Sequence, residues 1–545
     1  MQIKRKESNV DRTEDIKRIK QQVKKRPKRR KADMRRLLVA AVIFVAQLVF
    51  LIWALYRMNA FLLTSYIIFQ LIGAVAVVRI VLNRNNPSYK IAWIALILLV
   101  PVLGLVFYLM WGRGSYPQKR KKVLPEIAQM KVPLYRNSKE TEKQLERLFP
   151  NQERIMRYLC NAGFPIYQET AVTYYDLGDM FFPAIIEDIK KAKKFIFMEF
   201  YILSEGDLWQ EILAILKQKV AEGVEIRILY DDFGCITCLP KQFDKELNKI
   251  GIKTAAFNVI KPVVNNFYMN YRNHQKICVI DGNIGYTGGA NIADEYVNTV
   301  EAFGHWKDTG VRLAGRGVWS LTVNFLQMWK YCAYNKKCGL QDEEYRHYAP
   351  SESFCAKYAD TRGFVQPFSD GPMRTPGENE AEAVYMQMIN TAKNYIYITT
   401  PYLVPDNEML VALRLAAQSG VDVRLITPGV SDKGYVHLVT QSYYGTLLSA
   451  GVKIYEYLPG FIHAKSFVSD DEAAVVGTIN MDFRSFYLHF ENGVRLCGNK
   501  AVYDIRDDFI NTLEYCEKID YNKWRNRPWY KKAAQGILRL FAPLL

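Results

Sequence analysis

The sequence predicts an α/β protein in which two pseudo-symmetric lobes, each a mixed sheet flanked by helices, follow an N-terminal α-helical membrane region. Three observations carry this prediction. Apolar strand patterns alternate with helical patterns over most of the chain, segments of the first half recur in the second, and three apolar stretches precede both. The 545 residues, half of them apolar, suffice for several domains with buried cores.

The net charge of +18 is concentrated at the N-terminus. Residues 1–36 carry 16 Lys or Arg against 5 Asp or Glu, so the rest of the chain is only mildly basic. This distribution argues against a nucleic-acid-binding face on the lobes. A basic run beside an apolar segment suits an anionic membrane surface. A solvated tail that sets topology is the alternative, and the two are compatible.

Three apolar stretches, 37–55, 60–78 and 91–111, are each near the ~20 residues that cross a bilayer. For 60–78, a half-buried hairpin arm is the alternative. The basic tail indicates an N-terminus inside, and the basic residues at 113–122 favour the same side. We therefore expect a multi-pass protein of the cell membrane with two full crossings, one segment in the interface, and the lobes at the cytoplasmic face.

These patterns divide the chain into five parts. We expect a basic cytoplasmic tail at 1–36, a transmembrane region at 37–112 and a linker at 113–160. The first lobe is expected at 161–350, and the second at 351–545 with a C-terminal amphipathic segment. That segment, 524–545, could lie in a membrane interface or pack on the second lobe.

The two lobes repeat each other in order. Residues 192–197 (AKKFIF) match 392–397 (AKNYIY), 224–229 (VEIRIL) match 421–426 (VDVRLI), and 310–313 (GVRL) match 493–496 (GVRL). Such lobes facing each other would place corresponding motifs at one cleft.

A His-x-Lys-x4-Asp motif occurs once in each lobe, and an Asn follows each His by 17 residues. The two copies form the candidate catalytic set and two candidate phosphate-binding amides: His274, Lys276, Asp281 and Asn291; His463, Lys465, Asp470 and Asn480. His and Lys two apart on a strand share a face, and a bound phosphate would make that pairing favourable. One imidazole can attack phosphorus while the other protonates the leaving oxygen. This chemistry requires no metal and no other cofactor.

Strand parity separates the Asp residues from the rest of each motif. Asp281 lies seven residues after His274, so on an unbroken strand it faces away from the imidazole, and the same holds for Asp470. Although both belong to the signature, we expect them to stabilise strand ends. The duplication aligns Asp308 with Glu491, and these are the candidates to orient the imidazoles. An ordinary strand-edge charge is the alternative.

These motifs resemble those of the phospholipase D superfamily and, more closely, of bacterial cardiolipin synthases. The resemblance rests on the two His-Lys motifs and on several shorter segments: 87–104, 272–276 (RNHQK), 400–402 (TPY), 480–485 (NMDFRS) and 539–545 (RLFAPLL). It implies two phospholipase D-like lobes and transfer of a phosphatidyl group between two phosphatidylglycerol molecules through a phospho-histidine. It also implies that His274 attacks and that His463 carries the proton. The alternatives are a membrane-bound hydrolase, a transferase with a different acceptor alcohol, another phosphodiesterase and a scaffold with a decayed site; the oligomeric state stays open.

Overall fold

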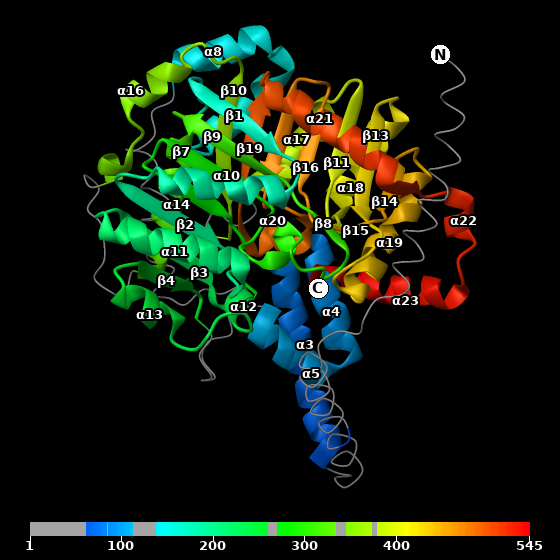
Figure 1. Cartoon of the computed structure of the whole chain (residues 1–545). Helices are drawn as coiled ribbons and strands as arrows, with labels where there is room; N and C mark the ends of the chain where they lie inside the picture. Colours follow the sequence, from blue (N-terminus) through cyan, green and yellow to red (C-terminus); the bar gives the residue numbers. More distant parts are fainter. Residues whose placement is uncertain are drawn as a thin grey trace. The chain divides into compact units, whose positions relative to one another are not determined.

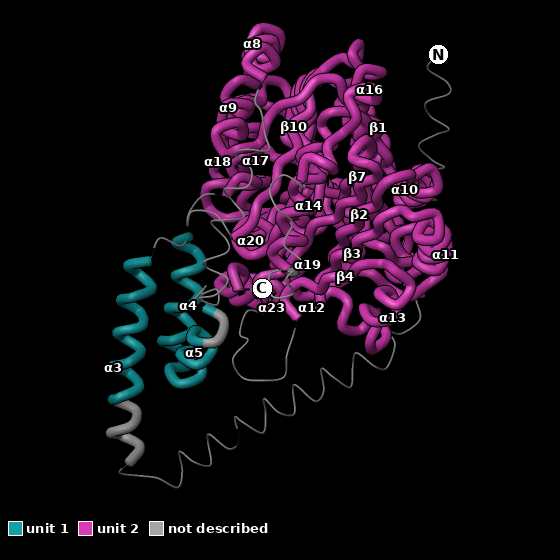
Figure 2. The backbone as a smooth tube through the Cα atoms, turned by 90° about the vertical axis from the view of Figure 1, so that its left-hand side faces the viewer, with its two compact units in different colours: residues 1–114 teal, residues 115–545 magenta. Residues whose placement is uncertain are grey.

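The structure is a computed structural model that describes residue 49 and residues 61–83, 86–112, 138–259, 270–333, 345–372 and 379–544. The predicted tail at 1–36, nearly all of the apolar stretch 37–55 and the first part of the predicted linker lie outside the described residues. The chain forms two compact units, residues 1–114 and 115–545 (Figure 2).

The described part of unit 1 is helical and consists of α3 (Phe61–Leu82), α4 (Pro87–Leu99), α5 (Pro101–Phe107) and a π-helical turn, η1 (Tyr108–Gly112). The predicted apolar stretch 91–111 is therefore divided between two helices and the turn. The break falls at Val100, which leaves helical geometry (φ −137°, ψ 77°) because the following Pro101 disfavours it. Across the described residues, no helix combines the length and the hydropathy that a membrane crossing requires.

The first lobe of unit 2 is built on a seven-stranded mixed sheet in the order β1-β9-β7-β6-β2-β3-β4 (Figure 1). Strands β2, β3 and β4 are parallel to one another, whereas the pairs β2–β6, β6–β7, β7–β9 and β1–β9 are antiparallel. The strands are β1 (Thr170–Tyr175), β2 (Phe195–Phe200), β3 (Glu225–Asp231), β4 (Lys253–Phe257), β6 (Ile277–Ile280), β7 (Ile284–Gly288) and β9 (Gly310–Gly315).

The second lobe repeats this topology. Its sheet has the order β10-β19-β17-β16-β11-β13-β14-β20, so seven strands correspond position by position to those of the first lobe. The strands are β10 (Phe364–Asp370), β11 (Tyr395–Thr399), β13 (Asp422–Pro428), β14 (Lys453–Tyr457), β16 (Ser466–Ser469), β17 (Ala473–Gly477), β19 (His489–Cys497) and β20 (Cys516–Lys518). The predicted class of two pseudo-symmetric α/β lobes is confirmed.

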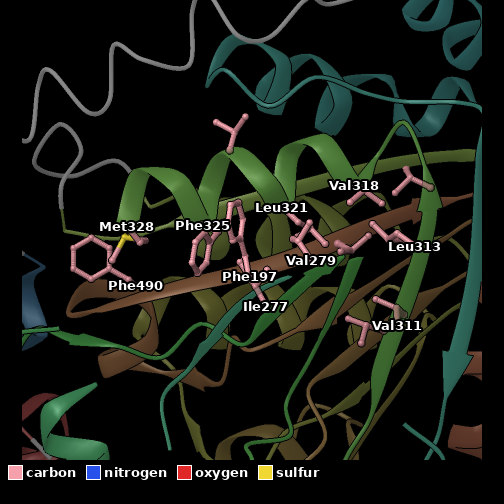
Figure 3. Close-up of a cluster of buried hydrophobic side chains, with 14 of the residues drawn as sticks. Phe197, Ile277, Val279, Val311, Leu313, Val318, Leu321, Phe325, Met328 and Phe490 are labelled. Carbon is pink, nitrogen blue, oxygen red and sulfur yellow. The ribbon is translucent and has the colours of Figure 1, made fainter. Parts of the chain in front are cut away.

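A large apolar cluster joins the two sheets (Figure 3). Helix α14 (Val318–Ala333) packs on strands of the first lobe and on β10, and α21 (Lys500–Thr512) packs on strands of the second lobe and on β1. Phe325 of α14 stacks on Phe197 with ring centroids 4.6 Å apart. Because the cluster draws side chains from both lobes, the lobes share one core.

Other helices cover the outer faces of the sheets. On the first lobe these include α10 (Gly178–Lys190), α11 (Asp207–Ala221), α12 (Asp232–Cys235) and α13 (Phe243–Lys249); on the second, α17 (Glu380–Thr391), α18 (Asn407–Gln418) and α19 (Gly434–Leu448). Within the predicted linker, α8 (Lys139–Leu148) and α9 (Glu153–Asn161) are formed, and α9 packs against α17. The chain ends in α22 (Tyr521–Arg525), α23 (Trp529–Leu540) and a 3-10 turn, η8 (Ala542–Leu544).

Candidate functional site

The two histidine motifs are placed by strand pairs that cross between the lobes. Strand β5 (Arg272–Asn273) of the first lobe pairs in parallel with β19 of the second, and His274 then donates its backbone N–H to Phe490 O at 2.9 Å. In the same way β15 (Gly460–Ile462) pairs with β8 (His305–Lys307), and His463 N–H donates to Lys307 O at 2.7 Å. Each histidine backbone is thus positioned by the opposite lobe.

Each imidazole contacts a carboxylate from the opposite lobe. His274 Nδ1 lies 3.0 Å from both carboxylate oxygens of Glu491, and His463 Nδ1 lies 2.6 Å from Asp308 Oδ2. The hydroxyl of Thr478 also donates to Glu491. An ionised carboxylate only accepts hydrogen bonds, so the proton belongs on Nδ1 of each ring and Nε2 keeps its lone pair.

The two motif lysines are buried beside their histidines. The ammonium of Lys276 donates to the backbone oxygen of His274, and that of Lys465 donates to the backbone oxygen of His463. Burial lowers the pKa of Lys276 to about 7 and that of Lys465 to about 8. These ammoniums are therefore poised to gain stability from an anion that enters the site.

Burial also keeps both imidazoles neutral near pH 7. It lowers the pKa of His274 well below 6.5, and the cations of Lys276 and Lys465 lower it further. The pKa of His463 falls to about 4 for the same reasons, although Asp308 opposes the shift. A neutral imidazole with a free lone pair can act as a nucleophile or as a base.

The two candidate phosphate-binding amides differ in their contacts. Asn291 is engaged within its own lobe, since its Oδ1 accepts from Ile202 N at 2.9 Å and its Nδ2 donates to Tyr296 Oη at 2.8 Å. Among the described residues the buried Oδ1 of Asn480 has no hydrogen-bond partner. The two amides are therefore not equivalent, because both amide atoms of Asn291 are engaged, whereas Asn480 keeps an acceptor without a partner.

A pocket of about 520 Å³ contains His274, His463, Asn291 and Asn480 in its wall. Aromatic and aliphatic side chains contribute most of its remaining surface. Sequence reasoning missed several polar members, among them Tyr201, Tyr296, Tyr402, Asp432, Lys433 and His489. Of these, Tyr402 lies in the TPY segment of the family resemblance, whereas His489 precedes Glu491 by two residues and so shares its strand face.

His489 has a distinct environment at the end of β19. Its ring centroid lies 5.5 Å from that of His274, and its Nδ1 is 3.6 Å from Glu491 Oε1. Neither ring nitrogen of His489 has a hydrogen-bond partner in the described part of the chain, and burial lowers the pKa of His489 to about 3.

His274, His489 and Glu491 are the described residues whose ligand atoms lie close enough together, within 4.8 Å, to hold a metal ion. The sequence predicts a reaction that needs no metal, and this stays a prediction.

The motif aspartates lie at strand ends, outside the pocket wall. Asp281 adopts φ 54° after β6 and accepts backbone N–H bonds from residues 193, 194 and 195 at 2.7–3.0 Å. Asp470, also at φ 54°, accepts from residues 393, 394 and 395 at 2.7–2.9 Å. Each carboxylate thus ties the end of its strand to the start of a neighbouring one.

Comparison with known proteins finds matching families, similar sequences and a similar fold. A family described as cardiolipin synthase, PLD-like domain, matches residues 185–311 and 385–513, and one described as phospholipase D-nuclease N-terminal matches 71–113. An uncharacterized protein of Streptococcus mutans is 41% identical over 471 residues, which cover 86% of this chain and 99% of that protein. A cardiolipin synthase of Halalkalibacterium halodurans is 35% identical over 497 residues, 90% of this chain and 95% of that protein. The structure of a phosphatidylserine synthase of Haemophilus influenzae shares the fold, with a TM-score of 0.54 and 16% identity over 72% of this chain and 97% of that one.

Proposed function

The chain belongs to the family of cardiolipin synthases with phospholipase D-like domains, and on that premise we propose that it is a phosphatidyltransferase. In this proposal it transfers a phosphatidyl group from one phosphatidylglycerol to another and forms cardiolipin and glycerol. The observation that carries the proposal is the pair of crossed His–carboxylate contacts, His274–Glu491 and His463–Asp308, in the wall of one pocket.

In the first step, His274 Nε2 attacks the phosphorus of phosphatidylglycerol. The P–N bond forms as the bond from phosphorus to the glycerol headgroup oxygen breaks. His463, having taken up a proton, donates it from Nε2 to that oxygen, and glycerol leaves. Lys276 and Lys465 stabilise the negative charge that develops on the non-bridging oxygens, together with the amides of Asn291 and Asn480.

In the second step, a glycerol hydroxyl of another phosphatidylglycerol attacks the phosphorus of phospho-His274. His463 takes the hydroxyl proton, the P–N bond breaks and cardiolipin is released. One phosphodiester replaces another, so the reaction needs no nucleotide. The free imidazole of His274 and the protonated His463 are then ready for the next cycle.

One geometric difference supports His274 as the nucleophile and His463 as the proton carrier. His463 Nδ1 lies 2.6 Å from a single oxygen of Asp308, whereas His274 Nδ1 lies 3.0 Å from both oxygens of Glu491. The shorter contact stabilises an imidazolium more strongly and so favours His463 as the group that carries the proton. Trapping the phospho-enzyme with labelled substrate and mapping the label tests the assignment, which a label on His463 would overturn.

We place the reaction at the cell membrane, which supplies phosphatidylglycerol and other anionic lipids. The match of residues 71–113 to a phospholipase D N-terminal family and the exposed apolar side chains of α3, such as Leu71, Val75 and Val78, support a membrane-associated unit 1. A multi-pass arrangement with the lobes at the cytoplasmic face follows from the basic residues at 1–36 and 113–122.

The decisive experiment incubates the detergent-solubilised full chain with phosphatidylglycerol alone. Cardiolipin and glycerol are the expected products. Phosphatidic acid and glycerol would instead identify a hydrolase that uses water as the acceptor. No turnover until another lipid or alcohol is added would identify a different acceptor. His274→Ala and His463→Ala should each reduce turnover by several orders of magnitude, because a single site uses both histidines.

A further inference from the structure

The C-terminal helix α23 is packed on one side and apolar on its exposed side. Gln535 is buried to 2% exposure where α23 packs on α19. Trp529 and Ile537 are 79% and 64% exposed, and Tyr530 is exposed as well. Their spacing of seven and eight residues places them on one helical face. Of the two alternatives predicted for segment 524–545, packing on the second lobe is observed for one side of α23. The membrane-interface alternative stays a prediction for the exposed apolar side.

A second pocket, of about 490 Å³, opens beside this face between α19, α22 and α23. Four cations line it, Arg414, Arg527, Lys532 and Arg539, together with hydroxyl donors such as Ser442. No described Asp or Glu is part of its wall. A concave surface with several cations and no carboxylate favours an anionic ligand.

None of these four cations forms an ion pair within the described residues. Arg527 and Arg539 are anchored by aromatic rings, since Arg527 stacks on Trp524 and Arg539 lies 4.4 Å from the ring of Tyr443. Arg414 lacks such an anchor, and its buried Nε has no hydrogen-bond partner in the described part of the chain. A partly buried guanidinium without a partner is costly unless an anion binds to it.

The basic and apolar faces of α23 lie side by side. Lys532, Gly536 and Arg539 recur at spacings of three and four residues on the pocket side, and Ile537 is on the adjoining face. A Cβ at Gly536 would meet nothing within 4 Å, so the helix surface there is open. This geometry suits a molecule with an anionic head and an apolar body.

We propose that α23 and the pocket beside it form a binding site for an anionic phospholipid, with the phosphate among the four cations and the acyl chains along the exposed apolar face. The site is distinct from the catalytic pocket, with which it shares no lining residue. The two are connected, because α19 contributes Tyr435 and Val439 to one pocket and Ser442 and Thr446 to the other. A lipid bound at α23 would therefore dock unit 2 on a membrane surface close to the catalytic pocket.

The test counts lipid sites on the detergent-solubilised full chain by equilibrium dialysis of labelled short-chain phosphatidylglycerol. His274→Ala is the background, so that lipid is not consumed. Arg414→Gln with Lys532→Gln removes the two pocket cations that are not anchored by an aromatic ring. Because a basic residue contributes about 1 kcal/mol toward an anionic surface, we expect one class of sites to weaken by about thirty-fold, while the remaining sites are unchanged.

The matched control is Lys393→Gln with Lys500→Gln, which removes two exposed cations that line neither pocket and should leave binding unchanged. Lys532→Gln alone, at an exposed position, repeats the test if the double variant folds poorly. Unchanged binding in the Arg414 and Lys532 variant would overturn the proposal. Equal binding of phosphatidylcholine, or displacement of the lipid by inorganic phosphate, would overturn it also. Turnover is measured separately, on the enzyme that retains His274. A negative result in the binding test therefore does not contradict the proposed reaction.

Discussion

At the residue scale, the chemistry of the site is set by which atom of each polar side chain is already hydrogen-bonded to the protein. Nδ1 of each imidazole contacts a carboxylate, and this leaves Nε2 for the reacting phosphate. Both motif lysines are buried, and neither forms an ion pair with a described carboxylate. Each ammonium is oriented by its hydrogen bond to a backbone oxygen. A group bonded in this way has a defined orientation before substrate arrives, which favours charge stabilisation in the transition state.

Removing either carboxylate charge should slow the reaction without unfolding the protein. We expect Glu491→Gln and Asp308→Asn each to lower kcat by roughly two to four orders of magnitude, because the amide no longer selects the Nδ1–H tautomer or stabilises an imidazolium. Steady-state kinetics measures the loss, and thermal unfolding checks the fold. As a control, Glu472→Gln changes a carboxylate outside the pocket wall and should leave kcat unchanged. Full activity in both amide variants would show that these residues do not orient the rings.

The alkaline limb of kcat/KM should begin near pH 7, where Lys276 starts to lose its charge, followed near pH 8 by Lys465. On the acid side, kcat should fall below about pH 4, because a His463 that stays protonated cannot take the hydroxyl proton in the second step. A bound phosphodiester anion favours the ammonium forms, so the alkaline limb of kcat should lie at higher pH than that of kcat/KM. An alkaline limb of kcat at lower pH would contradict this electrostatic account.

At the element scale, the turns that follow the motif strands stabilise the sheets. Asp281 and Asp470 adopt a positive φ, which side chains with a short polar group tolerate best, and each accepts three backbone N–H bonds. The same arrangement in both lobes follows from the duplication. In unit 1, Pro101 has the opposite effect and ends a helix within a predicted apolar stretch.

Replacing a motif aspartate should therefore affect stability and not chemistry. We expect Asp281→Ala to lower the free energy of unfolding by about 2 kcal/mol, because three N–H groups lose their acceptor and alanine is unfavourable at φ 54°. Urea denaturation measures the change, and the folded fraction should keep the wild-type kcat. Asp281→Asn, which tolerates the same φ and keeps an oxygen acceptor, should lose less. A large fall in kcat with unchanged stability would return Asp281 to the catalytic set.

At the scale of the whole molecule, two lobes of one chain share a core and build one site. The apolar cluster of Figure 3 takes side chains from both sheets, and the Asn492 side chain donates to Thr287 Oγ1 across the lobes at 2.7 Å. The two strand pairs that carry the histidines cross the same boundary. Each half of the pocket is therefore held in part by the opposite lobe.

Unit 2 should therefore unfold as one cooperative body. Native-state hydrogen exchange should give the central strands β2 and β11 the same opening free energy, because losing either lobe exposes the shared core. Phe325→Ala, which removes the ring stacked on Phe197, should lower both opening free energies together. Exchange of β2 at a lower free energy than β11 would show that the lobes unfold independently.

The sequence by itself determined the features that depend on local periodicity. Repeated strands, the doubled motif and the outward direction of Asp281 and Asp470 all follow from residues close together along the chain. Asp308 and Glu491 could be named as candidates because the duplication aligns them. The apolar pattern of residues 91–111 predicted one continuous helix-length stretch, but Pro101 divides that stretch between two helices.

Only the tertiary structure decided which carboxylate serves which histidine. His274 and Glu491 are 217 residues apart and His463 and Asp308 are 155 apart, and the pairing is crossed because β5 and β15 each pair with a strand of the opposite lobe. The different contacts of Asn291 and Asn480, and the place of His489 beside His274, also arise from long-range packing. A repeat in the sequence predicts two equal halves, whereas packing around one pocket makes those halves different.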